Sequence, residues 1–183
     1  MKDLRIYGLK TVLALFVVIA FGISVLAQGP VWKAGQFKEL VTGKATRKDV
    51  VRVLGDVKPT KSGKLETYSY ADKGEFGGKV LVDVNAATGV VEAITEQFSP
   101  NLTRTQAYKK YGKDYNEVRY SVSECPQEGA TPMVYRDAKG GIELLEYPKK
   151  GLILWPNQYG FDIAAAVVRA KALPGKRPQC GKK

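Results

Sequence analysis

Six carboxylates on the predicted strands are the residues of this 183-residue chain that suit acid–base chemistry. They are Glu66, Asp83, Glu92, Glu96, Glu143 and Glu146. The chain contains no His, which removes His-based triads, the commonest general base and the usual zinc ligand. A hydrolase would therefore need a pair of these carboxylates. Because acidic residues that alternate with apolar ones on a strand usually form a solvated face, we expect no catalytic residue, no cofactor and no metal site.

Aromatic side chains on or near the predicted strands are the candidates for partner binding. Tyr and Trp favour interfaces because a large apolar body ends in a polar group. The candidates are Tyr68, Tyr70, Tyr147, Trp155 and Tyr159, with Phe161 close by in the sequence. Aromatic residues also bury readily, so each of them is equally well explained as a core residue.

The first 27 residues have the layout of a secretory signal peptide. Basic residues precede an uncharged apolar run at residues 11–27, and Val25 and Ala27 occupy the small-residue positions before a cleavage site. The run is shorter than the ~20 residues that a membrane span usually needs. We therefore expect a signal peptide at residues 1–27 and a periplasmic or secreted protein. The alternative is an uncleaved N-terminal membrane anchor.

The chain is basic, with 29 Lys and Arg against 18 Asp and Glu and a formal net charge of +11. This charge favours acidic partners and anionic lipid head groups, although it also keeps an exported protein soluble. An exported protein is not expected to bind nucleic acid. Basic residues are densest in residues 172–183, where Pro and Gly predict a loosely attached tail. In an oxidising compartment, Cys125 and Cys180 would most simply form one disulfide.

Two segments of the chain share one helix pattern with the same spacing. In each, a Thr is followed three residues later by an acid or amide and nine residues later by a Gly. The residues are Thr46, Asp49 and Gly55 in the first segment and Thr103, Gln106 and Gly112 in the second. The Thr and the acid or amide suit a capping box, and the Gly suits positive φ at a helix end. The pattern predicts two short helices of about two turns each.

Strands are predicted after each helix, from alternating apolar residues and the turn residues between them. They are residues 65–71, 80–84 and 90–97 in the first half, and residues 142–147, 151–155 and 161–170 in the second. Residues 163–170 also suit a helix because they are rich in Ala, but their parallel with residues 90–97 favours a strand. On that earlier strand we expect Val91, Ala93 and Thr95 to share one side.

The two halves differ by an insertion at residues 113–137. Within it, residues 117–121 and 133–136 have the composition to pair as extra strands. Ahead of the first capped helix, residues 31–41 predict another short helix, with Phe37, Leu40 and Val41 as its apolar contacts. No equivalent helix is expected ahead of Thr103.

The predicted fold class is α+β, with short helices packed on one face of an antiparallel sheet and the other face partly open. The predicted organisation is a signal peptide at 1–27, a first helix-plus-sheet repeat at 28–98, a second at 99–171 and a basic tail at 172–183. Each half alone has little apolar surface for a core. We therefore expect the two halves to share one core.

The first half resembles the SmpA/OmlA family, the BamE-like domain. The matching residues are Gly43, Thr46, Arg47, Asp49, Val50, Leu54 and Gly55, followed by strands at 68–70, 80–84 and 89–94. The resemblance covers residues 31–97 and, more weakly, 101–170. Two such units in tandem resemble the β-lactamase-inhibitory protein. The resemblance implies a sheet that binds another protein through an open concave face, and it implies no catalytic residues.

Together these features predict a non-catalytic protein-binding module of the cell envelope. Its expected partner is another envelope or secreted protein, with at most weak contact to anionic lipid. The alternatives are a small carboxylate-dependent hydrolase and a binder of anionic lipid or polymer.

Overall fold

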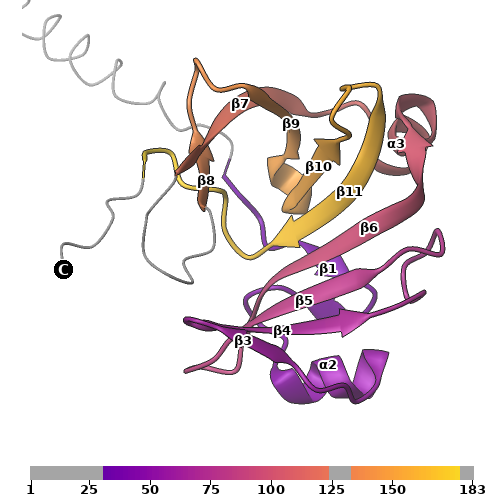
Figure 1. Ribbon diagram of the computed structural model, residues 1–183, viewed down its shortest axis with the longest axis vertical. Helices are drawn as coiled ribbons and strands as arrows, with labels where there is room; N and C mark the ends of the chain where they lie inside the picture. The colour runs from indigo at the N-terminus through magenta and orange to yellow at the C-terminus, as the bar shows by residue number, and fades with distance from the viewer. Residues whose placement is uncertain (1–30, 124–132, 178–183) are drawn as a thin grey trace, which may run out of the picture. The chain divides into compact units, whose positions relative to one another are not determined.

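A computed structural model describes residues 31–123 and 133–177 of the chain. The described residues from Trp32 onward belong to one compact unit. Their elements in chain order are β1 (Gln36–Phe37), β2 (Leu40–Val41), α2 (Arg47–Leu54), β3 (Thr60–Ser62), β4 (Leu65–Tyr70), β5 (Val80–Asn85), β6 (Val91–Thr103), α3 (Arg104–Tyr111), β7 (Asn116–Ser123), β8 (Met133–Arg136), β9 (Ile142–Tyr147), the 3-10 turn η1 (Pro148–Lys150), β10 (Leu152–Pro156) and β11 (Asp162–Arg169). This part of the chain is an α+β fold, as predicted (Figure 1).

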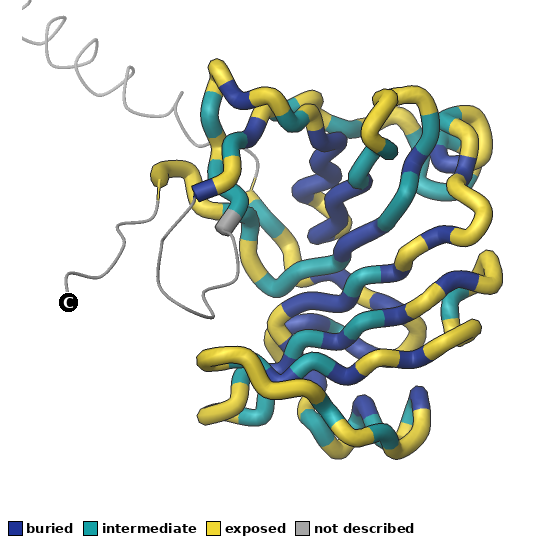
Figure 2. The backbone as a smooth tube through the Cα atoms, viewed as in Figure 1, coloured by how far each residue is buried: buried dark blue, intermediate teal, exposed yellow. Residues whose placement is uncertain are grey.

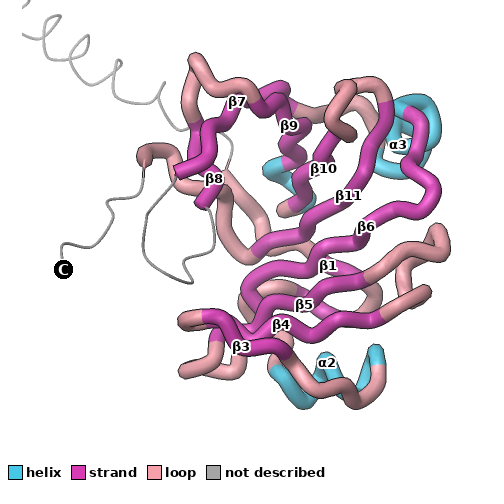
Figure 3. The backbone as a smooth tube through the Cα atoms, viewed as in Figure 1, coloured by secondary structure: helices cyan, strands magenta, loops and turns pink. Residues whose placement is uncertain are grey.

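Nine strands form one antiparallel sheet in the order β3-β4-β5-β6-β11-β10-β9-β7-β8. The centre of the sheet is the pairing of β6 with β11, which runs from Thr103 opposite Asp162 to Ala93 opposite Arg169. This pairing joins the two halves of the chain, so the sheet continues across position 99 without a break. Figure 3 shows β3, β4, β5, β6 and β11 of this sheet side by side, with α2 next to β4 and α3 at the end of β6.

Both helices pack on the same face of the sheet. Tyr68, Val82 and Ile94 are aligned across β4, β5 and β6, and they are buried with Val50 and Leu54 of α2. α3 covers the same face over β9, β10 and β11, where a second buried cluster lies. The predicted position of the short helices on one sheet face is therefore confirmed.

The opposite face is open over one half of the sheet and covered over the other. Ser69, Leu81 and Thr95 are aligned across β4, β5 and β6 and are exposed or partly exposed. The alternation of buried and accessible positions along these strands is visible in Figure 2. The accessible residues on this side form a surface that we call the open face: Leu65, Thr67, Ser69, Leu81, Asp83, Thr95, Gln97 and Ala165.

A third buried cluster covers the other end of this face. It consists of Tyr120, Leu144 and Ile153, with Trp32, Val134 and Leu173 among the residues packed against it. Leu173 and its neighbour belong to the segment predicted as a loose tail, yet the Arg136 N–H donates to the Pro174 carbonyl at 2.8 Å. The start of that segment is therefore attached to the sheet.

The helix predicted at residues 31–41 is wrong, because these residues form the β1–β2 hairpin. Phe37 pairs directly with Leu40 across a two-residue turn that begins at Lys38, whose φ is 51°. Both apolar side chains are buried in the first cluster. Residues three apart meet on one face of a helix, but they also meet across a two-residue hairpin. The apolar spacing alone therefore could not separate the two structures.

β6 also differs from its prediction in two ways. Val84 pairs with Val91 and Asp83 with Ala93, so Glu92 is an extra residue, a β-bulge. The bulge places Val91 on the side of Ile94 rather than with Ala93 and Thr95. The strand also runs on to Thr103, past Pro100, at a place where its register with β11 is irregular. Pro is tolerated at such irregularities because no ladder N–H is needed there.

The remaining strand predictions are confirmed. Residues 117–121 and 133–136 pair as parts of β7 and β8, with Tyr120 opposite Arg136. The Ala-rich segment is strand β11 and not a helix. Burial on a central strand outweighs the helix propensity of Ala, which is a weak preference.

Both helix starts have the predicted caps. The Thr46 N–H donates to Asp49 Oδ2 at 2.8 Å, and the Thr103 N–H donates to Gln106 Oε1 at 2.9 Å. In α3 the Gln106 N–H also donates to the Thr103 hydroxyl at 3.2 Å, which completes the reciprocal box. These bonds satisfy backbone groups that the helix itself leaves free.

Both helix ends are tied to the sheet by a tyrosine. The Tyr70 hydroxyl donates to the Gly55 carbonyl at 3.0 Å, and the Tyr147 hydroxyl donates to the Gly112 carbonyl at 2.9 Å. The two glycines have φ of 103° and 86°, a region that favours glycine. Tyr70 ends β4 and Tyr147 ends β9, so the same contact occurs once in each half.

Removal of either tyrosine hydroxyl should weaken the fold by a similar amount. We expect Tyr70→Phe and Tyr147→Phe each to lower the free energy of unfolding by about 1 kcal/mol, since each loses one partly buried hydrogen bond. Urea unfolding followed by circular dichroism measures the change. Tyr159→Phe is the matched control, because Tyr159 is 70% exposed and should show no change. An unchanged free energy of unfolding in both variants would show that these two hydrogen bonds do not stabilise the fold.

Stability should fall at alkaline pH. Burial raises the pKa of Tyr147 to about 12, and the hydrogen bond to Tyr108 raises the pKa of Tyr115 to about 12. In the unfolded chain a tyrosine ionises near pH 10, so between about pH 10 and 12 the unfolded state loses its protons first. Tyrosinate absorbance and ellipticity recorded together should show ionisation accompanying unfolding. Tyr147→Phe should make the decline shallower, and an unchanged slope would contradict this assignment.

Candidate functional site

Three of the five aromatic residues predicted to bind a partner are core residues. Tyr68 and Tyr70 are each 3% exposed and Tyr147 is 1% exposed. They lie on the helix-covered face, because strand alternation places them in line with buried valines and leucines. Their assignment to a contact surface is therefore corrected: in this fold they pack and support the helices.

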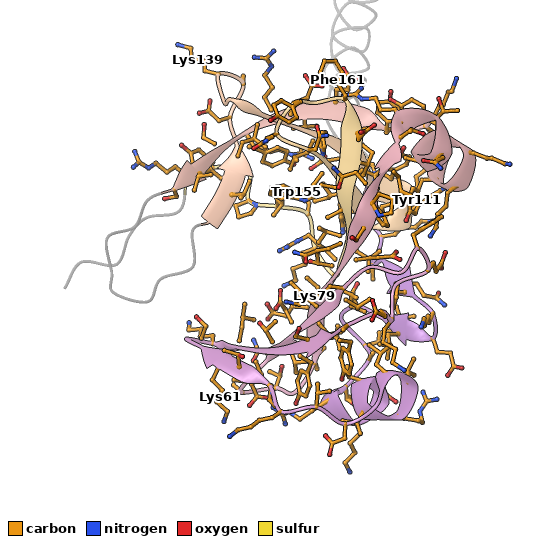
Figure 4. All side chains as sticks on the ribbon, turned by 45° about the vertical axis from the view of Figure 1, so that its right-hand side comes forward. Lys61, Lys79, Tyr111, Lys139, Trp155 and Phe161 are labelled. Atoms are coloured by element: carbon orange, nitrogen blue, oxygen red, sulfur yellow. The ribbon has the colours of Figure 1, made fainter. Side chains whose placement is uncertain are left out.

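Trp155 and Tyr159 are the two candidates that remain accessible. Trp155 lies on β10 opposite Ala165 and is partly buried against the third cluster. Its indole Nε1 is buried and has no hydrogen-bond partner among the described residues. Tyr159 is 70% exposed and Phe161 is 76% exposed, both at the turn between β10 and β11. Figure 4 shows Phe161 at one end of β11, well away from Trp155.

The open face is formed by short and mainly uncharged side chains. Apolar Leu65, Leu81 and Ala165 alternate across it with hydroxyl and amide residues, and Trp155 lies at its border with the covered end. One internal bond fixes it, from the Thr67 hydroxyl to Asp83 Oδ1 at 2.7 Å. The surface therefore combines apolar area with hydrogen-bonding groups on a rigid sheet.

Arg169 lies at the edge of this surface, in line with Ala93 and Asp83 across three strands. Burial lowers the pKa of its guanidinium, and the nearby carboxylates of Asp83 and Glu92 oppose that shift. Its Nε donates to the Lys171 carbonyl at 3.3 Å. The position adds one partly buried positive charge beside the Asp83 carboxylate on an otherwise uncharged surface.

The six predicted carboxylates are dispersed, and each has a separate partner. The partners are Arg47 for Glu66, Thr67 for Asp83, Asn85 for Glu92, the Glu75 N–H for Glu96, Arg104 for Glu143, and Tyr120 with Arg136 for Glu146. No two of them share a hydrogen-bond partner within the described ranges. Residues 31–123 and 133–177 also contain no group of three or more His, Cys, Asp or Glu placed to hold a metal ion.

Glu146 is the centre of a buried polar cluster. Its side chain is fully buried, accepts a hydrogen bond from the Tyr120 hydroxyl and forms an ion pair with Arg136. Burial and the adjacent Glu146 carboxylate raise the pKa of Tyr120, so the hydroxyl remains a donor. The cluster ties edge strand β8 to β7 and β9. Both oxygens of the Glu146 carboxylate have a partner, which identifies the cluster as a structural contact.

A pocket of about 210 Å³ lies on the helix-covered face, where the two halves of the chain meet. Glu96, Lys110 and Tyr111 are among its lining residues. The sequence does not reveal it, because its residues come from the β1–β2 turn, the β4–β5 loop, the end of α3 and three central strands. The one available signal was Glu96, an acidic residue on the same strand side as Ile94.

Several predictions fall on residues that the structure does not describe. The disulfide between Cys125 and Cys180 and the signal peptide at residues 1–27 lie outside the described residues, as do the last six residues of the basic tail, 178–183. In the described part, no helix is both long enough and apolar enough to cross a membrane.

Loss of Arg136 should destabilise the fold by leaving Glu146 buried without a cation. We expect Arg136→Met to lower the free energy of unfolding by about 2–3 kcal/mol, less than for a fully buried pair because the Arg136 side chain is 43% exposed. Chemical denaturation measures this. Arg119→Met, on the exposed side of β7, should change little.

The double variant Arg136→Met/Glu146→Gln separates lost charge pairing from lost packing. Because it removes both charges, we expect it to regain more than half of the stability that Arg136→Met loses. If the double variant is no more stable than the single one, the buried charge is not the cause.

No family model, curated protein or solved structure matches this chain. The resemblance of its first half to the SmpA/OmlA unit therefore stays a prediction from the sequence.

Proposed function

We propose that this chain is a non-catalytic protein-binding module that contacts its partner through the open face. The observation that carries the proposal is a helix-free half of a sheet on which Leu81, Thr95 and Gln97 are exposed or partly exposed, although Ala93 and Val167 between them are buried. Trp155 lies at its border with an indole N–H that has no partner among the described residues.

The open face is preorganised for binding. Strands β4, β5, β6 and β11 have neighbours on both sides, so the backbone of the open face is fixed before binding. Short side chains such as Thr67, Thr95 and Ala165 lose little rotamer entropy when covered. Trp155 lies at the border of this surface, and Trp is a residue type enriched at interface hot spots.

We further propose that the two halves are tandem BamE-like repeats. The matching helix caps and the Tyr–Gly bond at each helix end support a common origin of the two halves. The central place of β6 and β11 also supports it, because each is the last strand of its half. In this proposal the partner is another envelope or secreted protein, and the chain acts outside the cytoplasm.

Photo-crosslinking tests the surface directly. A benzoylphenylalanine at position 95 should give a covalent adduct with another envelope protein in cells, whereas the same residue at position 105 should not. Thr105 is exposed on α3, the helix that covers the opposite sheet face. Adducts of equal yield at both positions would count against the open face.

A matched pair of substitutions then tests affinity for the captured partner. We expect Thr95→Arg to weaken binding at least about tenfold, because a long charged side chain in the middle of the open face must be desolvated. Thr105→Arg adds the same side chain outside that surface and should leave affinity within about twofold. Calorimetric titration gives both values, and unfolding curves show whether each variant is folded. Equal affinity of both variants would refute the proposal.

A further inference from the structure

The pocket and the open face lie on opposite sides of the sheet, because adjacent residues of β6 point to opposite sides. Thr95 belongs to the open face, whereas Ile94 and Glu96 line the pocket. In Figure 4, Tyr111 and Trp155 appear on opposite sides of β11. The pocket is therefore a separate site that the proposed function does not use.

The pocket has an apolar floor of limited size. Ile94, Leu152, Ala166 and Val168 form this floor on three central strands. At the ≈30 Å³ that one water occupies in the liquid, 210 Å³ corresponds to roughly seven waters. This is the size of a small metabolite with a short hydrocarbon group.

Two polar groups in the pocket have unused hydrogen-bonding capacity. Glu96 is 4% exposed, and its Oε1 accepts the Glu75 N–H at 2.5 Å. Glu96 forms no ion pair with any described residue, although a carboxylate has about four acceptor positions. The Tyr111 hydroxyl has no hydrogen-bond partner in the described part of the chain. Burial and the carboxylates of Glu96 and Glu75 raise the pKa of Tyr111, so it keeps its proton.

Two ammonium groups in the pocket lining are not neutralised. Lys38 Nζ donates to the Lys73 carbonyl at 3.1 Å, and Lys150 Nζ donates to the Tyr111 carbonyl at 2.6 Å. Neither pairs with a carboxylate among residues 31–123 and 133–177, and each has two further N–H donors. Lys110 differs from them because it forms an ion pair with Glu75.

We propose that this pocket binds a small zwitterion, an α-amino acid with an aliphatic side chain. The ligand ammonium would bind Glu96 and the Tyr111 hydroxyl, and its carboxylate would bind Lys38 and Lys150. The aliphatic group would lie on the apolar floor. A ligand cation compensates a buried carboxylate that otherwise has one backbone donor, and this compensation is the main source of selectivity.

Simpler ligands leave part of the site unmatched. An amine without a carboxylate can bind Glu96, but it offers no anion to the ammonium groups of Lys38 and Lys150. A carboxylic acid without an amine can bind these two lysines, but it offers no cation to Glu96 and brings a second anion toward it. A molecule with both groups on one small apolar body offers a partner to each of these groups.

Calorimetric titration of the full chain with L-leucine and L-valine tests the proposal. We expect both to bind, and we expect leucinamide and 4-methylpentanoate, which each lack one charged group, to bind at least about tenfold more weakly. These comparisons use the unaltered protein, so they do not depend on the folding of any variant.

Substitutions then locate the site. Glu96→Gln and the double variant Lys38→Met/Lys150→Met should each weaken L-leucine binding about tenfold or more. Lys149→Met is the matched control, since Lys149 neighbours Lys150 in sequence but pairs with Asp114 at 3.0 Å. Thr95→Arg should not alter L-leucine binding, which keeps this test independent of the open face.

Three results would overturn the proposal. They are no binding of L-leucine or L-valine at millimolar concentration, equal binding of leucinamide or 4-methylpentanoate, and equal loss of binding in Lys149→Met. Binding that survives Glu96→Gln unchanged in a folded protein would also place the ligand elsewhere.

Discussion

The pairing of β6 with β11 is the constraint on which the rest of the structure depends. It joins the last strand of each half, so neither half leaves a long edge strand unpaired at this position. It also links the cores, because Val168 of β11 packs against both the α2 cluster and the α3 cluster. A half of this size alone buries too small a fraction of its surface for a robust core. The two halves are therefore better understood as one sheet with two helix-covered portions.

This central pairing also explains why one strand supplies two different surfaces. Strand geometry sends successive side chains to opposite faces, so β6 presents Thr95 on the open face and Glu96 in the pocket. The Glu92 bulge sets this phase, because it shifts the alternation by one residue between Val91 and Ile94. Without the bulge, Val91 would lie on the face opposite to Ile94 and Glu96, so either Val91 or these two residues would leave the helix-covered face. A single extra residue thus decides which side chains are available to a partner.

Features with local causes could be predicted from the sequence, and features with distant causes could not. The caps at Thr46 and Thr103 depend on residues within one turn, so their spacing was sufficient. The β1–β2 hairpin was mistaken for a helix because a three-residue apolar spacing fits both structures. The burial of Tyr68 and Tyr147 depends on which sheet face the helices cover, which the sequence does not state. The pocket joins residues from Gln36 to Val168, so no single stretch of sequence reveals it.

Glu146 and Glu96 differ in how their buried charge is paired: the first is paired within the fold, and the second is left able to bind a ligand. Both are buried carboxylates on strands, and their sequence contexts do not distinguish them. Glu146 receives a phenol donor and a guanidinium, so its burial is compensated within the fold. Glu96 receives one backbone N–H and faces a pocket, so its burial is compensated only in part. The Glu96 side chain holds the β4–β5 loop through this bond but its charge stays half-paired, which favours a ligand cation as its second partner.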